Sequence, residues 1–317
     1  MDPIISVEHL LKRYRTAAVA AVDDISFEVR AGELFAFLGP NGAGKATTIS
    51  ILTTTLSKTG GTVTIAGHDL DREATAVRRE IGIIFQNPSV DQHLSAEENI
   101  RLHVAVYGQY AYRPFYRLMP AEYRQRVEHL ATVVGLGGDL FKPLSTYSGG
   151  MKRKLEIIRS LMHRPAVLFL DEPTAGLDPV SRRALWDHLK EVRRSDGTTI
   201  FLTTHYLEEA EDADRLCVID HGRISMIGTP DELKDRWLER TVELDAVDRP
   251  ALVAELGRLG LQPTERPDGV LRVGFAGSTA QDLIARIRTP LSVLRVREPS
   301  LEEAYVELLR QSGEAVA

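Results

Sequence analysis

A glycine-rich segment between two apolar runs constrains this chain most. Residues 33–38 form a run that is apolar after Glu33 and predicts a buried strand, and residues 47–52 predict the start of a helix. Glycines at a strand–turn–helix junction let backbone N–H groups approach a phosphate chain, and the helix N-terminus adds positive potential. The residues that we assign to nucleotide binding at this loop are Gly39, Pro40, Asn41, Gly42, Ala43, Gly44, Lys45, Ala46, Thr47 and Thr48. The segment therefore predicts a phosphate-binding loop in which Lys45 reaches the outer phosphates.

Position 46 departs from this pattern. A serine or threonine usually follows the lysine, and its hydroxyl ligates Mg²⁺. Ala46 has no such oxygen. Thr47 does not replace it, because one step along a helix turns the side chain by roughly 100°. We therefore expect retained nucleotide binding, weaker dependence on Mg²⁺ and slower hydrolysis.

A second apolar run ends in two acids. Residues 166–170 predict a buried strand, and Asp171 and Glu172 follow it. In parallel sheets, ligands bind at the carboxyl ends of the strands. A solvated strand end would explain the two acids alone, but together with the phosphate-binding loop they predict a metal carboxylate, Asp171, and a residue that polarises the attacking water, Glu172.

The composition suits a globular protein, because 43% of the 317 residues are hydrophobic and 26% are charged. The single cysteine, Cys217, permits no internal disulfide, suits a reducing compartment and is expected to be a small buried residue. The net charge of −6 disfavours a nucleic-acid partner. We find neither a signal-peptide layout nor an apolar stretch near the ~20 residues of a membrane-spanning helix. A membrane role is therefore expected to act through a partner.

Alternating strand and helix patterns predict an α/β fold with a mainly parallel sheet. Ser95 and Glu98 form a capping-box pattern that opens a helix, and residues 180–194 predict another helix. We expect an ATP-binding domain over residues 1–235, with a helical subdomain at about residues 90–160, and an accessory α+β domain over residues 236–317. Its expected elements are strands at 241–245, 270–275 and 291–296, helices at 251–259 and 280–288, and a last helix beginning at Ser300 with Glu303 in a second capping box.

The segment Tyr147-Ser148-Gly149-Gly150-Met151 resembles the signature of the ATP-binding cassette (ABC) family, usually written LSGGQ. Further motifs stand in that family's order from residue 4 to about residue 230. They are an aromatic for the adenine, a glutamine after a strand, the D-loop at residues 175–178 and the switch histidine, and their key residues are Tyr14, Gln86, Asp178 and His205. The chain is therefore similar to a P-loop NTPase of the ABC cassette type.

The resemblance implies a composite site for ATP and Mg²⁺ shared by two copies of the chain. Ser148, Gly149 and Gly150 would face the γ-phosphate of ATP held by the partner copy. Gln86 would join Asp171 at the metal. His205 would contact the γ-phosphate and act with Glu172 in catalysis, and Asp178 would link the two sites.

Tyr147 and Met151 replace the usual leucine and glutamine of the signature. This variant signature resembles that of exporters of the daunorubicin/doxorubicin-resistance type and of related lipid and polysaccharide exporters. The ending at residues 298–305 also resembles that group. The resemblance implies a peripheral ATPase at the cytoplasmic face of the cell membrane, bound near Gln86 to a separate integral-membrane permease that exports a drug, lipid or glycan. The aromatic segment 107–116 belongs either to that docking surface or to local packing.

Two other functions stay open. One is a soluble ATP switch of the same fold that acts on a macromolecule without transport. The other is a nucleotide-binding subunit in which Ala46 impairs hydrolysis. The sequence does not identify the transported substrate.

Overall fold

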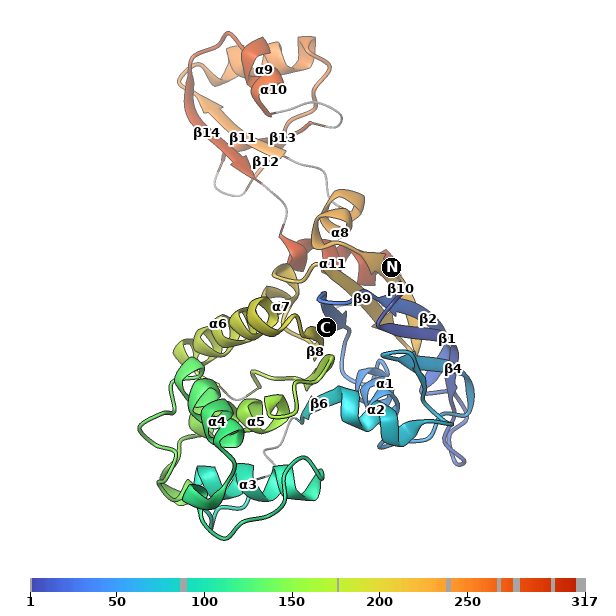
Figure 1. The fold of residues 1–317 in the computed structure, drawn as a ribbon. Helices are drawn as coiled ribbons and strands as arrows, with labels where there is room; N and C mark the ends of the chain where they lie inside the picture. The colour runs from blue at the N-terminus through green and yellow to red at the C-terminus, as the bar shows by residue number, and fades with distance from the viewer. Residues whose placement is uncertain are drawn as a thin grey trace. The chain divides into compact units, whose positions relative to one another are not determined.

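The computed structural model describes residues 2–85, 90–175, 177–237, 241–266, 269–275, 280–297 and 300–311 (Figure 1). The chain divides into two compact units, Met1–Ile227 and Gly228–Ala317. Within the described ranges, the helices fall short of the length and apolar content that a membrane crossing requires.

A six-stranded sheet forms the centre of the first unit. Its order is β10 (Arg223–Gly228), β9 (Arg215–Asp220), β3 (Leu34–Leu38), β8 (Thr199–Thr204), β7 (Val167–Asp171) and β6 (Ile81–Ile84). The pairs β9–β3, β3–β8, β8–β7 and β7–β6 are parallel. All residues of β3 and β8 are buried, as expected for central strands covered on both faces. The predicted α/β class with a mainly parallel sheet is confirmed.

The N-terminal strands form a separate antiparallel sheet. Its order is β2 (Val22–Val29), β1 (Ile5–Lys12), β4 (Gly60–Ile65) and β5 (His68–Asp69). Buried and exposed positions alternate along β2, because only one of its faces meets the core. The sequence analysis did not anticipate this second sheet, since strand propensity does not specify a pairing partner.

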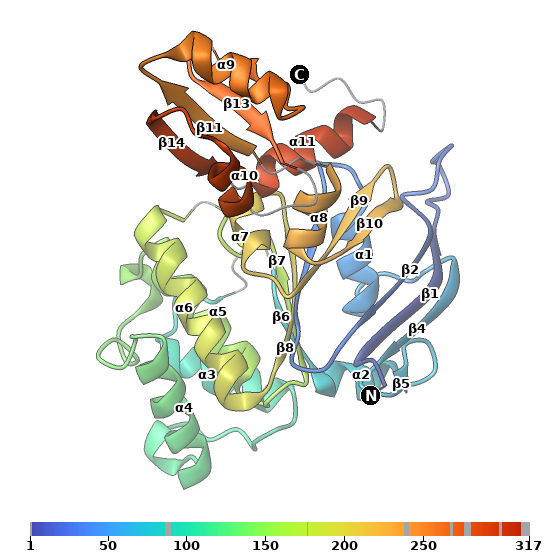
Figure 2. The same cartoon turned by 90° about the horizontal axis from the view of Figure 1, so that it is seen from above.

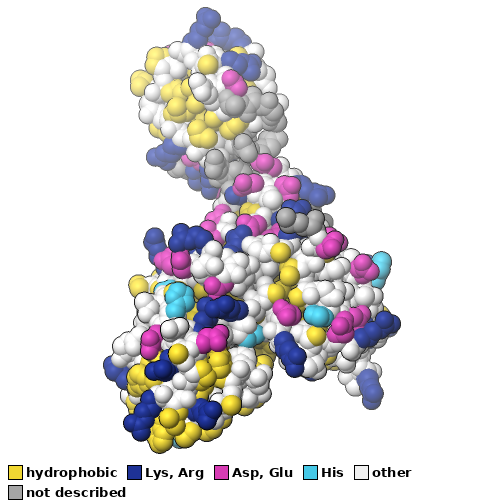
Figure 3. All heavy atoms as spheres, in the orientation of Figure 1, with side chains coloured by type: hydrophobic (Ala, Val, Ile, Leu, Met, Phe, Trp, Pro, Cys, Tyr) yellow, Lys and Arg dark blue, Asp and Glu magenta, His cyan; other side chains and the backbone are white. Residues whose placement is uncertain are grey.

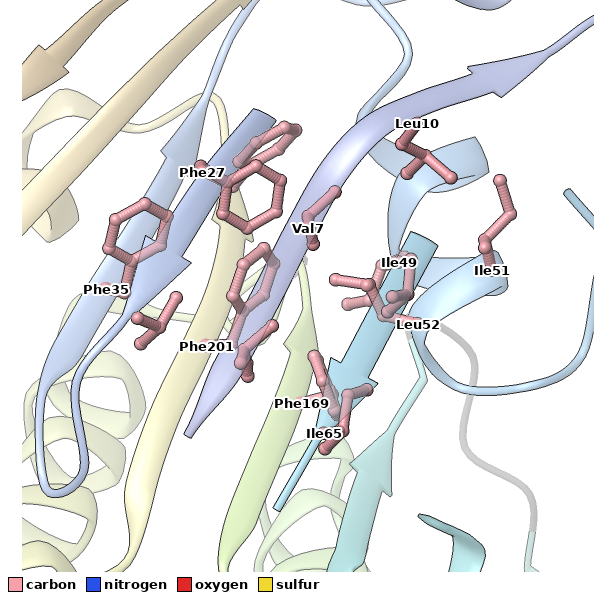
Figure 4. Close-up of a cluster of buried hydrophobic side chains, with 14 of the residues drawn as sticks. Val7, Leu10, Phe27, Phe35, Ile49, Ile51, Leu52, Ile65, Phe169 and Phe201 are labelled. Carbon is pink, nitrogen blue, oxygen red and sulfur yellow. The ribbon is translucent and has the colours of Figure 1, made fainter. Parts of the chain in front are cut away.

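The main core lies between the two sheets and α1 (Lys45–Leu52), as Figure 4 shows. The ring of Phe27 lies 5.8 Å from that of Phe35 and 6.1 Å from that of Phe201, which joins β2 to β3 and β8. This packing holds β3, and the loop that follows it, against the antiparallel sheet. Cys217 is fully buried in the same core, and this burial raises the pKa of its thiol. The expectation of a small buried cysteine is confirmed.

The other side of the parallel sheet carries helices, as Figures 1 and 2 show. These are α3 (Ala96–Val106), α4 (Ala121–Val133), α5 (Gly149–Leu161) and α6 (Pro179–Asp196), with short turns η1 (Tyr116–Leu118) and η2 (Leu144–Thr146) between them. The capping box of α3 is confirmed, because Ser95 accepts from the Glu98 amide and Glu98 accepts from the Ser95 amide. Two shorter helices of the unit are α2 (Ala74–Glu80) and α7 (Leu207–Glu211).

The second unit contains a four-stranded antiparallel sheet in the order β12 (Thr264–Glu265), β13 (Leu271–Gly274), β11 (Thr241–Ala246) and β14 (Leu291–Arg297). With α9 (Arg249–Arg258) and α10 (Ala280–Arg286), the chain order is a split βαβ arrangement. The expected strands and helices are present, and their ends differ from the prediction by at most two residues. In the same unit, α8 (Pro230–Trp237) contacts α11 (Leu301–Gln311), whose Ser300–Glu303 capping box is also confirmed. The second compact unit includes α8 and begins at Gly228, while a domain boundary after residue 235 stays a prediction.

Candidate nucleotide site

Three predicted motifs meet because β3, β7 and β8 are parallel neighbours. Leu38 pairs with Thr204, and Asp171 pairs with Thr203. The glycine-rich loop follows β3, the acidic pair ends β7, and His205 follows β8. All three therefore lie at the carboxyl edge of one sheet, where such folds bind ligands.

A cavity of about 180 Å³ opens at this edge. It is lined by Ala21, Asn41, Gly42, Gly44, Lys45, Ala46, Thr47, Asp171 and Glu172. The structure thus brings the phosphate-binding loop and the acidic pair into one site. Ala21, which the sequence analysis did not single out, enters the lining from the turn before β2.

The loop backbone approaches its neighbours too closely for larger residues. Gly44 has a left-handed φ of 111°, and a Cβ there would lie 2.6 Å from the carbonyl oxygen of Ala21. A Cβ on Gly39 would lie 2.3 Å from the carbonyl oxygen of Ile219. Such a cradle leaves backbone N–H groups able to approach phosphate oxygens.

Thr48 lies behind this cradle. Its side chain is fully buried, and its hydroxyl donates to the carbonyl oxygen of Gly44 at 3.0 Å. Ala43 is also buried and lies outside the cavity lining. These two residues of the predicted set therefore shape the loop, whereas Ala46 and Thr47 line the cavity.

Lys45 is the buried cation of the site. Its ammonium donates to the carbonyl oxygens of Gly39 at 2.6 Å and Pro40 at 3.0 Å, and the residue is 6% exposed. Burial lowers the pKa of Lys45, and the charges of Glu172 and Asp171 oppose this shift. One cation and two carboxylates thus face the same small space, a charge arrangement suited to phosphates with a divalent metal.

The acidic pair is fixed by β8. The Thr203 hydroxyl donates to Asp171 Oδ1 at 2.6 Å, and the Glu172 amide donates to the Thr203 carbonyl oxygen at 3.1 Å. Glu172 has a left-handed φ of 44°, and its Oε1 lies 3.2 Å from His205 Nδ1. Thr203 was not predicted as a site residue, although a threonine ending an apolar strand is a usable signal.

Tyr14 lies beside the loop. Its hydroxyl is 3.5 Å from Thr47 Oγ1, the Lys12 ammonium lies 5.3 Å from the ring centre, and the residue is 42% exposed. An exposed ring next to the phosphate loop supports the adenine contact, which stays a prediction. Gln86 and Gly176 lie outside the described residues.

The signature residues lie away from the cavity lining. Ser148 caps α5 by accepting from the Met151 amide at 3.2 Å, and Ser148 and Gly149 are exposed. Asp178 caps α6, and its carboxylate accepts from the Ser181 hydroxyl at 2.6 Å. A Cβ on Gly150 would lie 3.0 Å from that Ser181 oxygen, so the signature and Asp178 are adjacent within one chain.

Arg153 connects the signature helix to the strand ends. Its guanidinium donates to the Pro173 carbonyl oxygen at 2.9 Å, to the Phe85 carbonyl oxygen, and to Glu156 at 3.0 Å. It is 5% exposed, and burial lowers the pKa of this guanidinium against the opposing charge of Glu156. The sequence analysis missed this residue. Its local signal is that it precedes Ile157 by one helical turn, because residues four apart share a helix face and Ile157 is buried.

A larger cavity of about 540 Å³ lies next to β6 and α3. Phe85, Leu102, Val106 and Tyr107 form its exposed apolar part, and each is at least 42% exposed. Its polar lining includes Arg78, Asp91, Asn99, His103, Glu156, Arg159, Ser160 and His163. This cavity adjoins the strand end that precedes residue 86.

The aromatic segment 107–116 divides between the two roles left open by the sequence. The rings of Tyr110 and Tyr116 pack at 5.6 and 6.3 Å from the ring of buried Tyr123. Tyr112 and Phe115 remain more than half exposed. Local packing therefore explains part of the segment, while its exposed rings remain available for docking.

Known proteins match both the sequence and the fold. The profile of the ABC transporter family matches residues 22–175. The chain is 42% identical over 314 residues to the daunorubicin/doxorubicin resistance ATP-binding protein DrrA of Streptomyces peucetius, covering 96% of this chain and 92% of that protein. It is 36% identical over 332 residues to the doxorubicin resistance ATP-binding protein DrrA of Mycobacterium tuberculosis (strain ATCC 25618 / H37Rv), covering 99% and 96%.

The fold is similar to a solved dimeric structure of a bacterial ABC transporter cassette, with a TM-score of 0.62 and 26% sequence identity over 71% of this chain and 98% of the other. The predicted P-loop cassette is thereby confirmed. Since the two relatives match over almost their whole length, the chain belongs to the ABC transporter family, as an ATP-binding subunit of the daunorubicin/doxorubicin resistance type.

Proposed function

We propose that two copies of this chain close on ATP and Mg²⁺ and hydrolyse the ATP to drive export through a separate integral-membrane subunit. One observation carries the proposal. Lys45, Asp171 and Glu172 share a cavity, whereas Ser148 and Gly149 are exposed outside its lining. A single chain thus holds each half of a composite site, and a second copy with twofold symmetry would complete both halves.

The chain's residues have distinct tasks in this reaction. When bound, ATP would supply the phosphoryl group, and Mg²⁺ would neutralise part of the charge that develops on the phosphate oxygens. Lys45 and the loop amides hold the phosphates, and Glu172 takes the proton of the attacking water. His205 orients the Glu172 carboxylate through the contact between Nδ1 and Oε1. The N-terminus of α5, contributed by the second copy, faces the γ-phosphate.

Among the described residues, Asp171 is the one that we expect to hold the metal. Asp171 lines the cavity and is held in place by the Thr203 hydroxyl. Gln86 is the second expected ligand by family resemblance. The methyl group of Ala46 lines the same cavity and offers no oxygen, so this chain would hold a metal ion with one protein ligand fewer than a serine or threonine at position 46 would allow.

The larger cavity supports docking of the permease. Its exposed apolar side chains on α3 and at the end of β6 suit the apolar face of an amphipathic segment. Figure 3 shows hydrophobic side chains gathered over the helical part of the first unit. A chain docked there works at the cytoplasmic face of the cell membrane, and the permease selects the exported drug, lipid or glycan.

The test combines three measurements on the full chain. We expect Mg²⁺-dependent phosphate release, an ATP-dependent dimer by light scattering, and co-purification with a multispanning membrane protein that is lost in Val106→Asp. Nucleotide binding without phosphate release would instead favour the impaired subunit that Ala46 suggests. ATP-dependent dimers with a ribosomal or other soluble partner, and no membrane protein, would favour the soluble switch.

A further inference from the structure

Glu209 is a buried carboxyl group close to the catalytic pair that the mechanism above does not use. It lies on α7, one helical turn after His205, and is 2% exposed. Buried carboxylates are costly unless they are paired or hydrogen-bonded, so such a group needs a structural reason.

Its partner lies on the segment that follows the acidic pair. The Thr174 hydroxyl donates to Glu209 Oε1, and Thr174 is fully buried. Thr174 shapes the turn between Glu172 and Asp178, because its carbonyl oxygen accepts from the Leu177 amide at 3.0 Å. The Glu209–Thr174 bond thus joins the turn that begins at Glu172 to the helix that follows His205.

Other contacts hold the Glu209 end of this bond. The Glu209 amide donates to the Tyr206 carbonyl oxygen at 3.2 Å, and the Tyr206 amide donates to Thr204 Oγ1 at 2.9 Å. The ring of Tyr206 lies 4.0 Å from that of His205 and 4.9 Å from the Arg182 guanidinium on α6. Displacing Glu209 would therefore displace the whole segment that carries His205.

Burial makes the charged form of the Glu209 carboxyl group less favourable than it is in water. Burial raises the pKa of Glu209, while the Thr174 and Thr204 hydroxyls and the charges of Arg182 and His205 oppose that shift. The carboxyl thus sits in a site that favours hydrogen bonding over solvation.

We propose that Glu209 is a positioning residue for ATP hydrolysis: by accepting from Thr174, it fixes the spacing between the segments that carry Glu172 and His205. The two segments are already joined where they leave β7 and β8, by the bond from the Glu172 amide to the Thr203 carbonyl oxygen and by the 3.2 Å contact between Glu172 and His205. The Glu209–Thr174 bond adds a buried tie further along both segments. This proposal rests on the proposed hydrolysis, because it assigns a residue to that reaction.

The kinetic test compares variants that break or keep the bond. Glu209→Ala and Thr174→Val should each lower kcat roughly 10- to 100-fold with little change in the KM for ATP, because small displacements of catalytic groups cost that much. Glu209→Gln and Thr174→Ser keep an acceptor and a donor and should retain kcat within about threefold. The double variant Glu209→Ala/Thr174→Val should be no slower than the single variants, because both remove one bond.

Glu208→Gln is the matched control, since Glu208 precedes Glu209 on α7 and is 86% exposed on its side chain. A normal kcat in Glu209→Ala, additive losses in the double variant, or equal losses in Glu209→Gln and Glu209→Ala would each overturn the proposal.

A second measurement does not depend on turnover. The imidazole NMR signal of His205, identified by its loss in His205→Ala, should shift or broaden in nucleotide-free Glu209→Ala and stay unchanged in Glu208→Gln. An unchanged His205 signal in Glu209→Ala would overturn the positioning role, whether or not the wild-type chain hydrolyses ATP. Absence of ATP hydrolysis by the wild-type chain, with a shifted His205 signal in Glu209→Ala, would contradict the proposed function alone.

Discussion

Ala46 and His103 both lie in cavities, but they differ in what their side chains offer. Ala46 lines the nucleotide cavity beside Lys45 and Asp171 and brings only a methyl group. His103 lines the larger cavity, and its Nδ1 lies 3.3 Å from an Arg159 guanidinium nitrogen. The behaviour of each follows from its own surroundings.

Ala46→Ser should restore the missing metal oxygen. We expect tighter Mg²⁺ dependence and hydrolysis faster by roughly tenfold, because metal positioning contributes several kcal/mol to phosphoryl transfer. Phosphate release measured across a Mg²⁺ titration checks this expectation. Ala46→Gly adds no oxygen and should show no comparable gain. Equal Mg²⁺ affinity and turnover in Ala46→Ser and the wild type would contradict the expectation that position 46 lacks a metal ligand.

His103 should make the protein less stable in acid. Burial, with the charges of Arg159 and His163, lowers the pKa of His103 from its ordinary 6.5 to about 3. The unfolded chain therefore takes up the proton first. Stability falls as the pH drops from about 6.5 towards 3, by at most about 1.4 kcal/mol per pH unit.

His103→Gln should flatten that decline, because glutamine does not titrate. Urea unfolding at pH 8 gives the packing cost of the substitution, and unfolding at pH 6, 5 and 4 gives the slope. Parallel slopes for the wild type and the variant would show that His103 does not drive the acid loss.

At the scale of elements, caps and strand ends determine where chemistry is placed. Ser95, Ser148 and Asp178 each cap a helix with a side-chain oxygen, and each was identifiable from its local sequence. What joins α5 to β6 and β7 was not identifiable, because Arg153 contacts residues 20 and 68 positions away in the chain.

Arg153→Met should destabilise the first unit by about 2–4 kcal/mol, since it removes the buried donor from the Pro173 and Phe85 carbonyl oxygens and one of the cations near Glu156, which also faces the charge of Arg159. Denaturant unfolding measures this loss. Arg153→Lys keeps the charge but not the forked donor geometry, so it should fall between the wild type and methionine. A methionine variant within about 1 kcal/mol of the wild type would show that the contacts are not stabilising.

At the scale of the whole molecule, the proposed composite site needs two chains. Lys45 lines a cavity after β3, and Ser148 caps α5 outside that lining. The test of this proposal is complementation between two inactive chains.

A mixture of Lys45→Ala and Ser148→Arg chains should regain activity, although neither chain hydrolyses ATP alone. Half of randomly mixed dimers contain both chains, and each holds one intact site of two, so the rate should reach about a quarter of the wild type. Phosphate release in a titration of one chain with the other measures it. Lys45→Ala mixed with the doubly substituted chain is the control and should stay inactive; equal rates in both mixtures would contradict the composite site.

The sequence by itself determined the α/β class and predicted the phosphate-binding loop, the acidic pair, the signature and the switch histidine. These depend on residues close together in the chain, where spacing alone constrains the chemistry. Tertiary structure decided the separate antiparallel sheet and the ties made by Thr203, Arg153 and Glu209, because each joins segments that meet only after the strands pair. It also decided that Ala46 faces the cavity while Thr48 turns away, since the direction of a side chain is fixed by the fold around it.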